Sequence, residues 1–412
     1  MKGNEMIIQN FIDRERLVSA PNYHPLPVVI SKGKGVWLWD VEGNKYIDMI
    51  TAYSAVSFGH GHPRLMKALT EQLNKVSVLS RAYYTDKLAP LLEKICAMSG
   101  LEMGIPMNSG VEAVETAIKA ARRWGYEVKG IPADQAEIIV AENNFHGRTL
   151  TAISFSTVDE YKQDFGPFTP GFKTIPFGDA QALEKAITPH TCAFLVEPIQ
   201  GEAGIIVPPP GWLKEVSRIC TENNVLLILD EVQSGLGRSG KMFAFQHEDI
   251  IPDGLILGKA LGGGILPISL FLSRREVLSL MTPGSHGSTF GGNPLACAVA
   301  YEALCLLEDE HLDQRSAELG MYMMDRLRKI NSPLIKEVRG KGLWIGVEFH
   351  SNLTSAWDIC IKMLSKGVLM KDTHETIVRF APPLIITKDE IDFVLDAFEK
   401  VVKEIEKEHG VS

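Results

Sequence analysis

The chain has 412 residues, of which 45% are hydrophobic and 23% charged, and its formal net charge is -9. This composition is that of an ordinary soluble globular protein, and the length exceeds what one hydrophobic core normally supports, so we expect two domains. The acidic balance argues against a general nucleic-acid binder, because phosphate contacts need clustered Lys and Arg. No apolar run approaches the roughly 20 residues of a membrane span, and residues 1–10 lack a signal layout, so we expect a cytoplasmic protein.

Six cysteines are scattered singly through apolar or helical stretches. Their spacing matches neither a zinc site nor a disulfide framework, and we expect reduced thiols in the core. They are Cys96, Cys192, Cys220, Cys297, Cys305 and Cys360.

The N-terminal part predicts a polar lead-in followed by a β-hairpin. Residues 1–22 are largely polar, and the Tyr23–Pro27 segment should be extended, because residues before proline avoid the helical region. Residues 36–39 and 45–47 flank Glu42-Gly43-Asn44, a pattern typical of a hairpin.

Two histidines, His60 and His62, stand two residues apart in the glycine-rich segment that follows. Such a pair could suggest a metal, but no carboxylate or cysteine lies nearby at ligand spacing. We therefore favour a structural loop and expect no metal site.

A helix N-terminus suited to phosphate is predicted at Ser109 and Gly110. Apolar residues recur at helical spacing from Val111 onward, so these two residues precede the first turn, where free amides and the helix dipole favour an anion. Ser109 with Glu112 also forms a good capping box, which by itself would explain the pattern. Both interpretations can hold together, because backbone amides can bind phosphate while the cap shapes the turn.

Two buried strands are predicted at residues 138–141 and 193–196. The first leads into a polar stretch that contains Phe145, although a Phe just past a strand is more often core than a cofactor platform. The second ends in the segment Glu197–Gly204. Strands that alternate with helices in this way predict a mainly parallel sheet covered on both faces.

The stretch at residues 225–264 contains two short apolar runs, each of which leads to a charged residue. The runs at residues 225–229 and 254–257 predict further parallel strands, followed by Asp230 and by Lys259. Ligands bind at the carboxyl ends of such strands. Pyridoxal phosphate needs a lysine to form a Schiff base and an acid to keep its pyridine nitrogen protonated. We therefore predict a pyridoxal-phosphate site with Lys259 and Asp230 in these two roles.

Simpler interpretations of this stretch exist. A lone Lys after a strand is usually solvated, and Asp-Glu after a strand is usually a turn. Gly235, Gly237 and Gly240 also spell G-x-G-x-x-G, which invites a nicotinamide dehydrogenase interpretation. That fingerprint requires the glycines in the strand-to-helix turn itself. Because residues 231–234 intervene and residues 241–247 show no helical stripe, we disfavour a dinucleotide site.

After residues 287–294 the pattern changes to that of an α+β domain, with which we expect the N-terminal hairpin to pack. A last amphipathic helix opens with a capping box from Thr387 to Glu390. Upstream of it, helices are predicted at residues 295–307, 316–330 and 356–365, a strand at residues 341–349, and an extended segment at residues 377–383.

The predicted fold is therefore α/β, with a large domain built on a mainly parallel central sheet and a smaller α+β domain. We expect three segments: residues 1–50 carry the hairpin that packs on the small domain, residues 51–293 form the large cofactor-binding domain, and residues 294–412 form the small domain.

Nearly the whole chain, from Asn22-Tyr23-His24-Pro25 to residues 377–384, resembles the class III (subgroup II) aminotransferases of fold type I. Within them it is most similar to the ornithine δ-aminotransferases, through Tyr23, Tyr53 and the stretch Trp124–Ile131. Acetylornithine and 4-aminobutyrate relatives typically lack the tyrosine at the position of Tyr53. The resemblance implies transfer of the δ-amino group of ornithine to 2-oxoglutarate. An N-acetylornithine or other ω-amino acid aminotransferase is the alternative.

The resemblance also implies which residues hold pyridoxal 5'-phosphate. Lys259 is implied as the Schiff-base lysine and Asp230 as the partner of the pyridine nitrogen. A contact to the phosphate from the neighbouring subunit further implies a homodimer with shared active sites, and this dimer can assemble further. The implied cofactor residues are Phe145 on the ring face, Gln233 near the 3-oxygen, Ser109, Gly110 and Val111 around the phosphate, and Ser288 and Thr289 from the neighbouring subunit.

The implied substrate residues are Tyr23, Tyr53, Arg148, Glu202 and Arg379. In the family, Tyr23 and Arg148 hold the α-carboxylate of ornithine while Glu202 pairs with Arg379. Glu202 then releases Arg379, which takes the α-carboxylate of glutamate or 2-oxoglutarate, and Arg148 takes the distal one. An ordinary surface ion-pair network is the simpler interpretation of these charges.

Two positions depart from the family pattern, since His146 stands where many ornithine enzymes have Trp, and Phe290 where many have Tyr. Both lie close to the cofactor loops, so they bear on substrate preference.

Two other classes of function compete with the aminotransferase: a fold-type-I epimerase or mutase, which needs no amino acceptor, and a non-enzymatic ligand-binding module.

Overall fold

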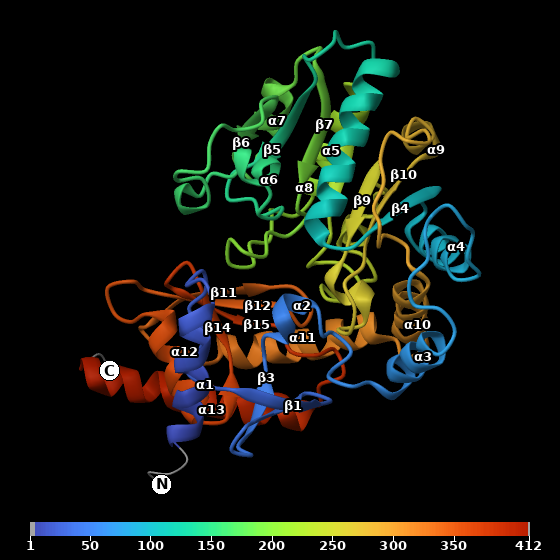
Figure 1. Cartoon of the computed structure of the whole chain (residues 1–412). Helices are drawn as coiled ribbons and strands as arrows, with labels where there is room; N and C mark the ends of the chain where they lie inside the picture. The colour runs from blue at the N-terminus through green and yellow to red at the C-terminus, as the bar shows by residue number, and fades with distance from the viewer. Residues whose placement is uncertain (1–4, 411–412) are drawn as a thin grey trace.

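A computed structural model describes residues 5–410 of the chain. A seven-stranded sheet forms the centre of one lobe, and two four-stranded sheets with four long C-terminal helices form the other lobe (Figure 1). All seven strands of the central sheet fall between residues 103 and 273, within the segment 51–293 that we propose as the large domain. Residues 1–4 of the proposed N-terminal segment, and residues 411–412 of the small domain, lie outside the described residues.

The central sheet has the predicted, mainly parallel character. Strands β9, β8, β7, β5 and β6 pair in parallel, and β10 runs antiparallel between β4 and β9. In spatial order the strands are β4 (Met103–Met107), β10 (Ser269–Ser273), β9 (Gly254–Leu257), β8 (Leu226–Asp230), β7 (Thr191–Val196), β5 (Glu137–Ala141) and β6 (Phe172–Ile175).

Both faces of this sheet are buried, which explains why its strands are continuous apolar runs. Successive residues of a strand point to opposite faces. In β8, Leu227 and Leu229 join one buried cluster, whereas Leu226 and Ile228 join another. The helices that cover the sheet are α5 (Gly110–Glu127), α6 (Leu150–Ser154), α7 (Ala180–Ala186), α8 (Trp212–Glu222) and α9 (Arg275–Leu278).

The first small sheet joins the two ends of the chain. The predicted hairpin is present as β2 and β3, and β3 pairs in parallel with β13 near the C-terminus. The indole Nε1 of Trp37 also donates to Glu390 at 3.0 Å. The sheet contains β1 (Ile30–Lys34), β2 (Trp37–Asp40), β3 (Lys45–Asp48) and β13 (Val368–Leu369).

The second small sheet places Arg379 in a buried strand. Its order is β11 (Ile335–Gly340), β12 (Ile345–Phe349), β15 (Ile377–Phe380) and β14 (Lys371–Thr373). The helices of this lobe are α10 (Pro294–Asp309), α11 (Leu312–Arg328), α12 (Ala356–Ser365) and α13 (Lys388–His409), and α13 opens with the predicted capping box.

Two sequence predictions need correction. The polar lead-in contains a helix, α1 (Glu5–Val18), and the strand predicted at residues 341–349 begins only at Ile345. Gly340 and Gly342 have positive φ, so the chain turns there and the preceding residues form β11 as a separate strand. The remaining elements are α2 (Thr51–Ser54), α3 (Pro63–Leu73), α4 (Leu88–Ser99) and the 3-10 turns η1 (Asp159–Tyr161), η2 (Ala244–Glu248) and η3 (Lys259–Gly262).

The six cysteines are all free, as predicted. Four of them are buried, and Cys96 and Cys305 are half-buried. No helix in residues 5–410 is long and apolar enough to cross a membrane.

Candidate active site

Asp230 and Lys259 lie at the same edge of the central sheet. Asp230 is the last residue of β8, and Lys259 follows β9 after one glycine, in η3. The two strands are parallel neighbours with Asp230 opposite Ile256, so both side chains leave the carboxyl edge of the sheet. Lys259 has a φ of 43°, a conformation that is uncommon for a residue other than glycine.

Lys259 has a depressed pKa. Burial lowers the pKa of its ammonium, and the charges of Glu202, Asp230 and Glu197 offset this shift only in part. A lysine of this kind carries a larger neutral fraction than an exposed one, and the neutral amine is the nucleophilic form.

Asp230 accepts two hydrogen bonds inside the protein. The Nδ1 of His146 lies 2.7 Å from its Oδ2, and the amide of Val232 donates to Oδ1 at 3.1 Å. Burial opposes protonation of His146, but its hydrogen bond to Asp230 and the carboxylate charge raise its pKa overall. This pairing could not be predicted from the sequence, because it requires the β5–α6 loop to fold over the end of β8.

A second buried carboxylate at this edge, Glu197, was not assigned a role from the sequence. It follows β7, the neighbour of β8, and burial raises its pKa to about 7. The amides of Phe145 and Gly201 donate to it at 3.1 and 3.4 Å. The position of Glu197 at a strand end beside that of Asp230 was the signal that could have identified it.

The start of α5 lies beside the turn that carries Lys259. Ser109 is the N-cap and forms the predicted capping box with Glu112, whereas the first amides of a helix have no intrahelical acceptor. A Cβ on Gly258 would lie 3.6 Å from the Cα of Gly110 and 3.3 Å from Val232. Free amides, a lysine and a buried aspartate thus share one edge of the sheet, and this arrangement fits the phosphate, aldehyde and ring nitrogen of pyridoxal phosphate.

Arg379 and Glu202 form an ion pair in the adjoining pocket. Arg379 Nη1 lies 3.0 Å from Glu202 Oε1, and Gln233 Nε2 donates to the same oxygen at 2.9 Å. Although burial raises the pKa of Glu202, the Arg379 charge and hydrogen bond lower it overall. Arg379 is buried and Glu202 is half-buried, so this ion pair is not the surface network considered from the sequence.

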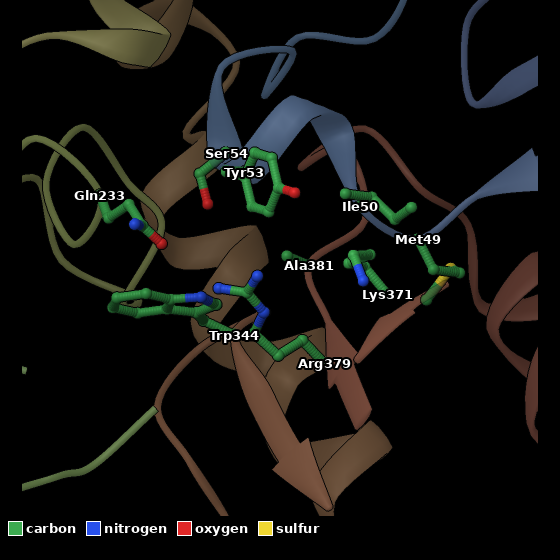
Figure 2. A pocket seen from close by; sticks show the side chains of 9 residues that line it. All are labelled: Met49, Ile50, Tyr53, Ser54, Gln233, Trp344, Lys371, Arg379 and Ala381. Carbon is green, nitrogen blue, oxygen red and sulfur yellow. The ribbon is translucent and has the colours of Figure 1, made fainter. Parts of the chain in front are cut away.

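Tyr53 covers this ion pair. The guanidinium carbon of Arg379 lies 5.0 Å from the centre of the Tyr53 ring, and Figure 2 shows the two side chains converging in the pocket. Burial raises the pKa of Tyr53, while Arg379 lowers it in part. The pocket is lined by Met49, Ile50, Tyr53, Ser54, Gln233, Trp344, Lys371, Arg379 and Ala381.

The turn that holds Tyr53 is strained. Four consecutive residues, from Thr51 to Ser54, have φ between 47° and 74°. Such residues cost about 1 to 2 kcal/mol each, so the surrounding structure must compensate. The carboxylate of Asp48 accepts from the amides of Ile50 and Thr51, and the Thr51 hydroxyl donates to Ala381 at 2.7 Å.

Arg148 and Tyr23 are less enclosed than the other predicted substrate residues. Arg148 is exposed, and its guanidinium carbon lies 3.5 Å from the centre of the Tyr161 ring, a residue that the sequence did not single out. Tyr23 is 78% exposed, but its neighbour His24 stacks on Trp357 at 4.0 Å. Both side chains therefore lie on solvent-facing segments, and neither belongs to the lining of the pocket.

Ser288 lies close to the start of α5 within its own chain. Its hydroxyl accepts from Asn108 Nδ2 at 3.0 Å, and the amide of Gly291 donates to it at 3.0 Å. Thr289 and Phe290 are exposed.

The two alternative motifs do not form their sites. His60 lies 2.9 Å from Asp48, His62 lies 3.8 Å from Glu310, and residues 5–410 contain no group of three or more metal-ligating side chains placed for an ion. Gly235, Gly237 and Gly240 lie in a series of turns that leads to η2, without the helix that a dinucleotide fingerprint requires.

Comparison with known proteins agrees with this geometry. The family model described as "Aminotransferase class-III" matches residues 18–402. The chain belongs to the class-III aminotransferases. The ornithine aminotransferase from Geobacillus sp. (strain WCH70) is 59% identical over 93% of this chain and 95% of its own.

Solved class-III structures give the same result. An ornithine aminotransferase from Toxoplasma gondii superposes with a TM-score of 0.96 at 45% identity, over 98% of this chain and 96% of its own, and partial occupancy of PLP is described at its active site. An acetylornithine aminotransferase from Elizabethkingia anophelis is also 45% identical, with a TM-score of 0.87, over 96% of this chain and 99% of its own. The predicted fold class is therefore confirmed.

Proposed function

We propose that this class-III aminotransferase transfers the δ-amino group of L-ornithine to 2-oxoglutarate. The products are glutamate and glutamate 5-semialdehyde, which cyclises to pyrroline-5-carboxylate. The observation that carries the proposal is an arginine, Arg379, held by Glu202 under Tyr53, beside the edge that carries Lys259 and Asp230. Two curated relatives, 59% and 57% identical to this chain, are named ornithine aminotransferase, which supports the same activity.

The cofactor is pyridoxal 5'-phosphate, which when bound supplies an aldehyde for the amine and a ring that withdraws electrons. Lys259 would hold the aldehyde carbon, and Asp230 would keep the ring nitrogen protonated. The amides of Gly110 and Val111 with Ser109 would bind the phosphate, Phe145 would cover the ring, and Gln233 would lie near its 3-oxygen.

Lys259 also moves the proton of the reaction. With the cofactor bound, the neutral amine of Lys259 would take the proton from the substrate carbon that bears the nitrogen, as general base, and would then deliver it to the carbon on the other side of that nitrogen, as general acid. The depressed pKa of Lys259 suits this task, because a base must be unprotonated when it acts.

In the first half-reaction, Tyr23 and Arg148 hold the α-carboxylate of ornithine while Glu202 neutralises Arg379. A free Arg379 would attract that carboxylate inward and present the α-amine, in place of the δ-amine, to the aldehyde of the cofactor. The ion pair therefore favours the δ-amine.

In the second half-reaction, Glu202 releases Arg379. The arginine then binds the α-carboxylate of 2-oxoglutarate or glutamate, and Arg148 binds the distal carboxylate. One pocket thus accepts a cationic chain in one step and a second carboxylate in the next.

A homodimer with shared active sites forms part of the proposal. Leu295 N donates to Ser77 O at 3.2 Å, so the segments around residues 77–84 and 285–295 lie side by side. They expose Tyr84 fully and Phe290 to 55%, an apolar surface that suits a subunit interface. Ser288 and Thr289 of one subunit would then contact the phosphate in the other.

A cytoplasmic location stays a prediction from the sequence.

An N-acetylornithine aminotransferase is the second candidate. The acetylornithine aminotransferase from Elizabethkingia anophelis and the ornithine aminotransferase from Toxoplasma gondii are both 45% identical to this chain. Tyr53 favours ornithine, since its ring and the Glu202 pair enclose the inner pocket.

The decisive test is the visible spectrum of the purified protein, recorded before and after addition of L-ornithine or N-acetylornithine without a keto acid. Loss of the cofactor band with ornithine alone, with formation of pyrroline-5-carboxylate, would support the proposal. Loss of the cofactor band with N-acetylornithine and not with ornithine would overturn the substrate. Turnover that needs no 2-oxoglutarate would indicate an epimerase or mutase, and no spectral change with any amine would indicate a binding module.

A further inference from the structure

Arg238 is a completely buried arginine that lines no part of the pocket. Its side chain is 0% exposed, and within residues 5–410 no carboxylate lies within ion-pair distance of its guanidinium. An unpaired buried charge is expensive, and proteins retain one only where its hydrogen bonds are well satisfied or where it has a further role.

The guanidinium of Arg238 donates to three separate chain segments. Its Nη1 reaches the carbonyl oxygens of Leu343 at 2.9 Å and Pro382 at 2.7 Å, and its Nη2 reaches the hydroxyl of Ser57 at 3.0 Å. Ser57 in turn donates to the carbonyl of Ser54 at 3.0 Å.

Each of these segments carries a side chain that lines the substrate pocket. Leu343 precedes Trp344, Pro382 lies three residues beyond Arg379, and Ser57 holds the strained turn of Tyr53. Figure 2 shows Tyr53, Trp344 and Arg379 meeting from different elements around one space. They are far apart in the sequence, so their mutual distances depend on contacts between the segments.

We propose that Arg238 is a positioning residue for substrate binding, which fixes the segments of Tyr53, Trp344 and Arg379 relative to one another through its planar fork of donors. The proposal rests on the function proposed above only in that this pocket binds the substrate carboxylates. A lysine cannot replace the fork, because its donors radiate from a single nitrogen.

The test uses the full-length enzyme loaded with its cofactor and compares R238K with wild type. The probe is glutarate, an unreactive five-carbon dicarboxylate, and its dissociation constant is measured by calorimetry beside the KM and kcat for ornithine. We expect about a tenfold or larger rise in both the dissociation constant and KM, since small displacements of binding groups have effects of this size. Cofactor content and the visible spectrum should stay as in wild type, because Arg238 contacts none of the predicted cofactor residues.

Two serine variants keep the test decisive if R238K fails to fold. S57A removes one acceptor of Arg238, whereas S273A is a control in another buried serine, whose hydroxyl donates to the carbonyl of Asp253 outside the pocket lining. S57A should weaken glutarate binding about threefold or more, and S273A should lower the melting temperature without weakening binding.

Glutarate affinity within twofold of wild type in R238K, or equal weakening in S57A and S273A, would overturn the positioning role. A wild-type enzyme that binds glutarate but does not turn over ornithine would overturn the proposed substrate alone, and the affinity ratios would still decide the role of Arg238.

Discussion

Glu202 Oε1 lies 3.0 Å from Arg379 Nη1, so the arginine at the inner end of the pocket is neutralised before any substrate enters. Gln233 donates to the same carboxylate oxygen, and the backbone carbonyl of Glu202 accepts from Thr373, the last residue of β14. The carboxylate can therefore leave Arg379 while its backbone stays fixed to the small sheet, as an exchange between two substrates requires.

Removal of this carboxylate should favour the wrong substrate orientation. A charge-assisted hydrogen bond is worth about 1.5 to 3 kcal/mol, so Glu202→Ala should change the preference between δ- and α-amine by roughly 10- to 150-fold. We expect a faster half-reaction with glutamate and a slower, less regiospecific one with ornithine, measured by stopped-flow absorbance. Glu337→Ala, which breaks an ion pair with Arg339 outside the pocket, is the matched control. Unchanged rates with both substrates would contradict the gate.

Loss of the Lys259 amine should stop turnover but leave the cofactor bound. Lys259→Ala removes both the covalent attachment and the proton carrier, so we expect kcat to fall on the order of 10⁴-fold or more. Borohydride reduction followed by mass spectrometry should attach the cofactor to wild type and not to the variant. Multiple turnovers by the variant, or attachment at another lysine, would contradict the assignment.

Mixing of two inactive variants should restore activity if the sites are shared between subunits. A Lys259→Ala chain and a chain with Ser288→Ala and Thr289→Ala are combined by refolding in equal amounts. Each hybrid dimer would contain one intact site, so we expect roughly a quarter of the wild-type activity.

The contact of Ser288 with Asn108 within one chain makes this result informative. If Ser288 and Thr289 instead serve the phosphate of their own chain, no hybrid contains an intact site and the mixture stays inactive. Sedimentation of the mixture shows that dimers have formed in either case.

Glu231 should make the enzyme less stable as the pH rises. Burial raises the pKa of this carboxyl from 4.5 to about 8, although the amides of Ala244 and Phe245 donate to it. Between pH 4.5 and 8 the folded chain therefore holds a proton that the unfolded chain has lost, and stability falls by up to about 1.4 kcal/mol per pH unit.

The variant Glu231→Gln should show a flatter pH profile of stability than wild type. Its amide group faces a backbone donor, so we also expect a pH-independent loss of stability. Thermal denaturation at saturating cofactor, from pH 5 to pH 8, measures the difference between the two profiles. Parallel profiles would show that Glu231 is ionised throughout this range.

The sequence alone determined the local elements and the chemistry at their ends. Continuous apolar runs identified the buried strands β5, β7, β8 and β9, because a sheet covered on both faces leaves no polar alternation. Asp230 and Lys259 could be found because each follows such a run directly. The capping boxes at Ser109 and Thr387 could likewise be predicted from the sequence, because a capping box involves residues only three positions apart.

Only the tertiary structure decided which distant residues share a space. His146 is hydrogen-bonded to Asp230, 84 positions away in the chain, and Arg238 is hydrogen-bonded to Ser57, Leu343 and Pro382. No periodic pattern in the sequence indicates these pairings. The left-handed turn at Tyr53 could not be predicted either, because Thr51 to Ser54 do not favour that conformation and adopt it through contacts with Asp48 and Ala381. Local patterns thus specify the elements, whereas long-range hydrogen bonds assemble the pocket.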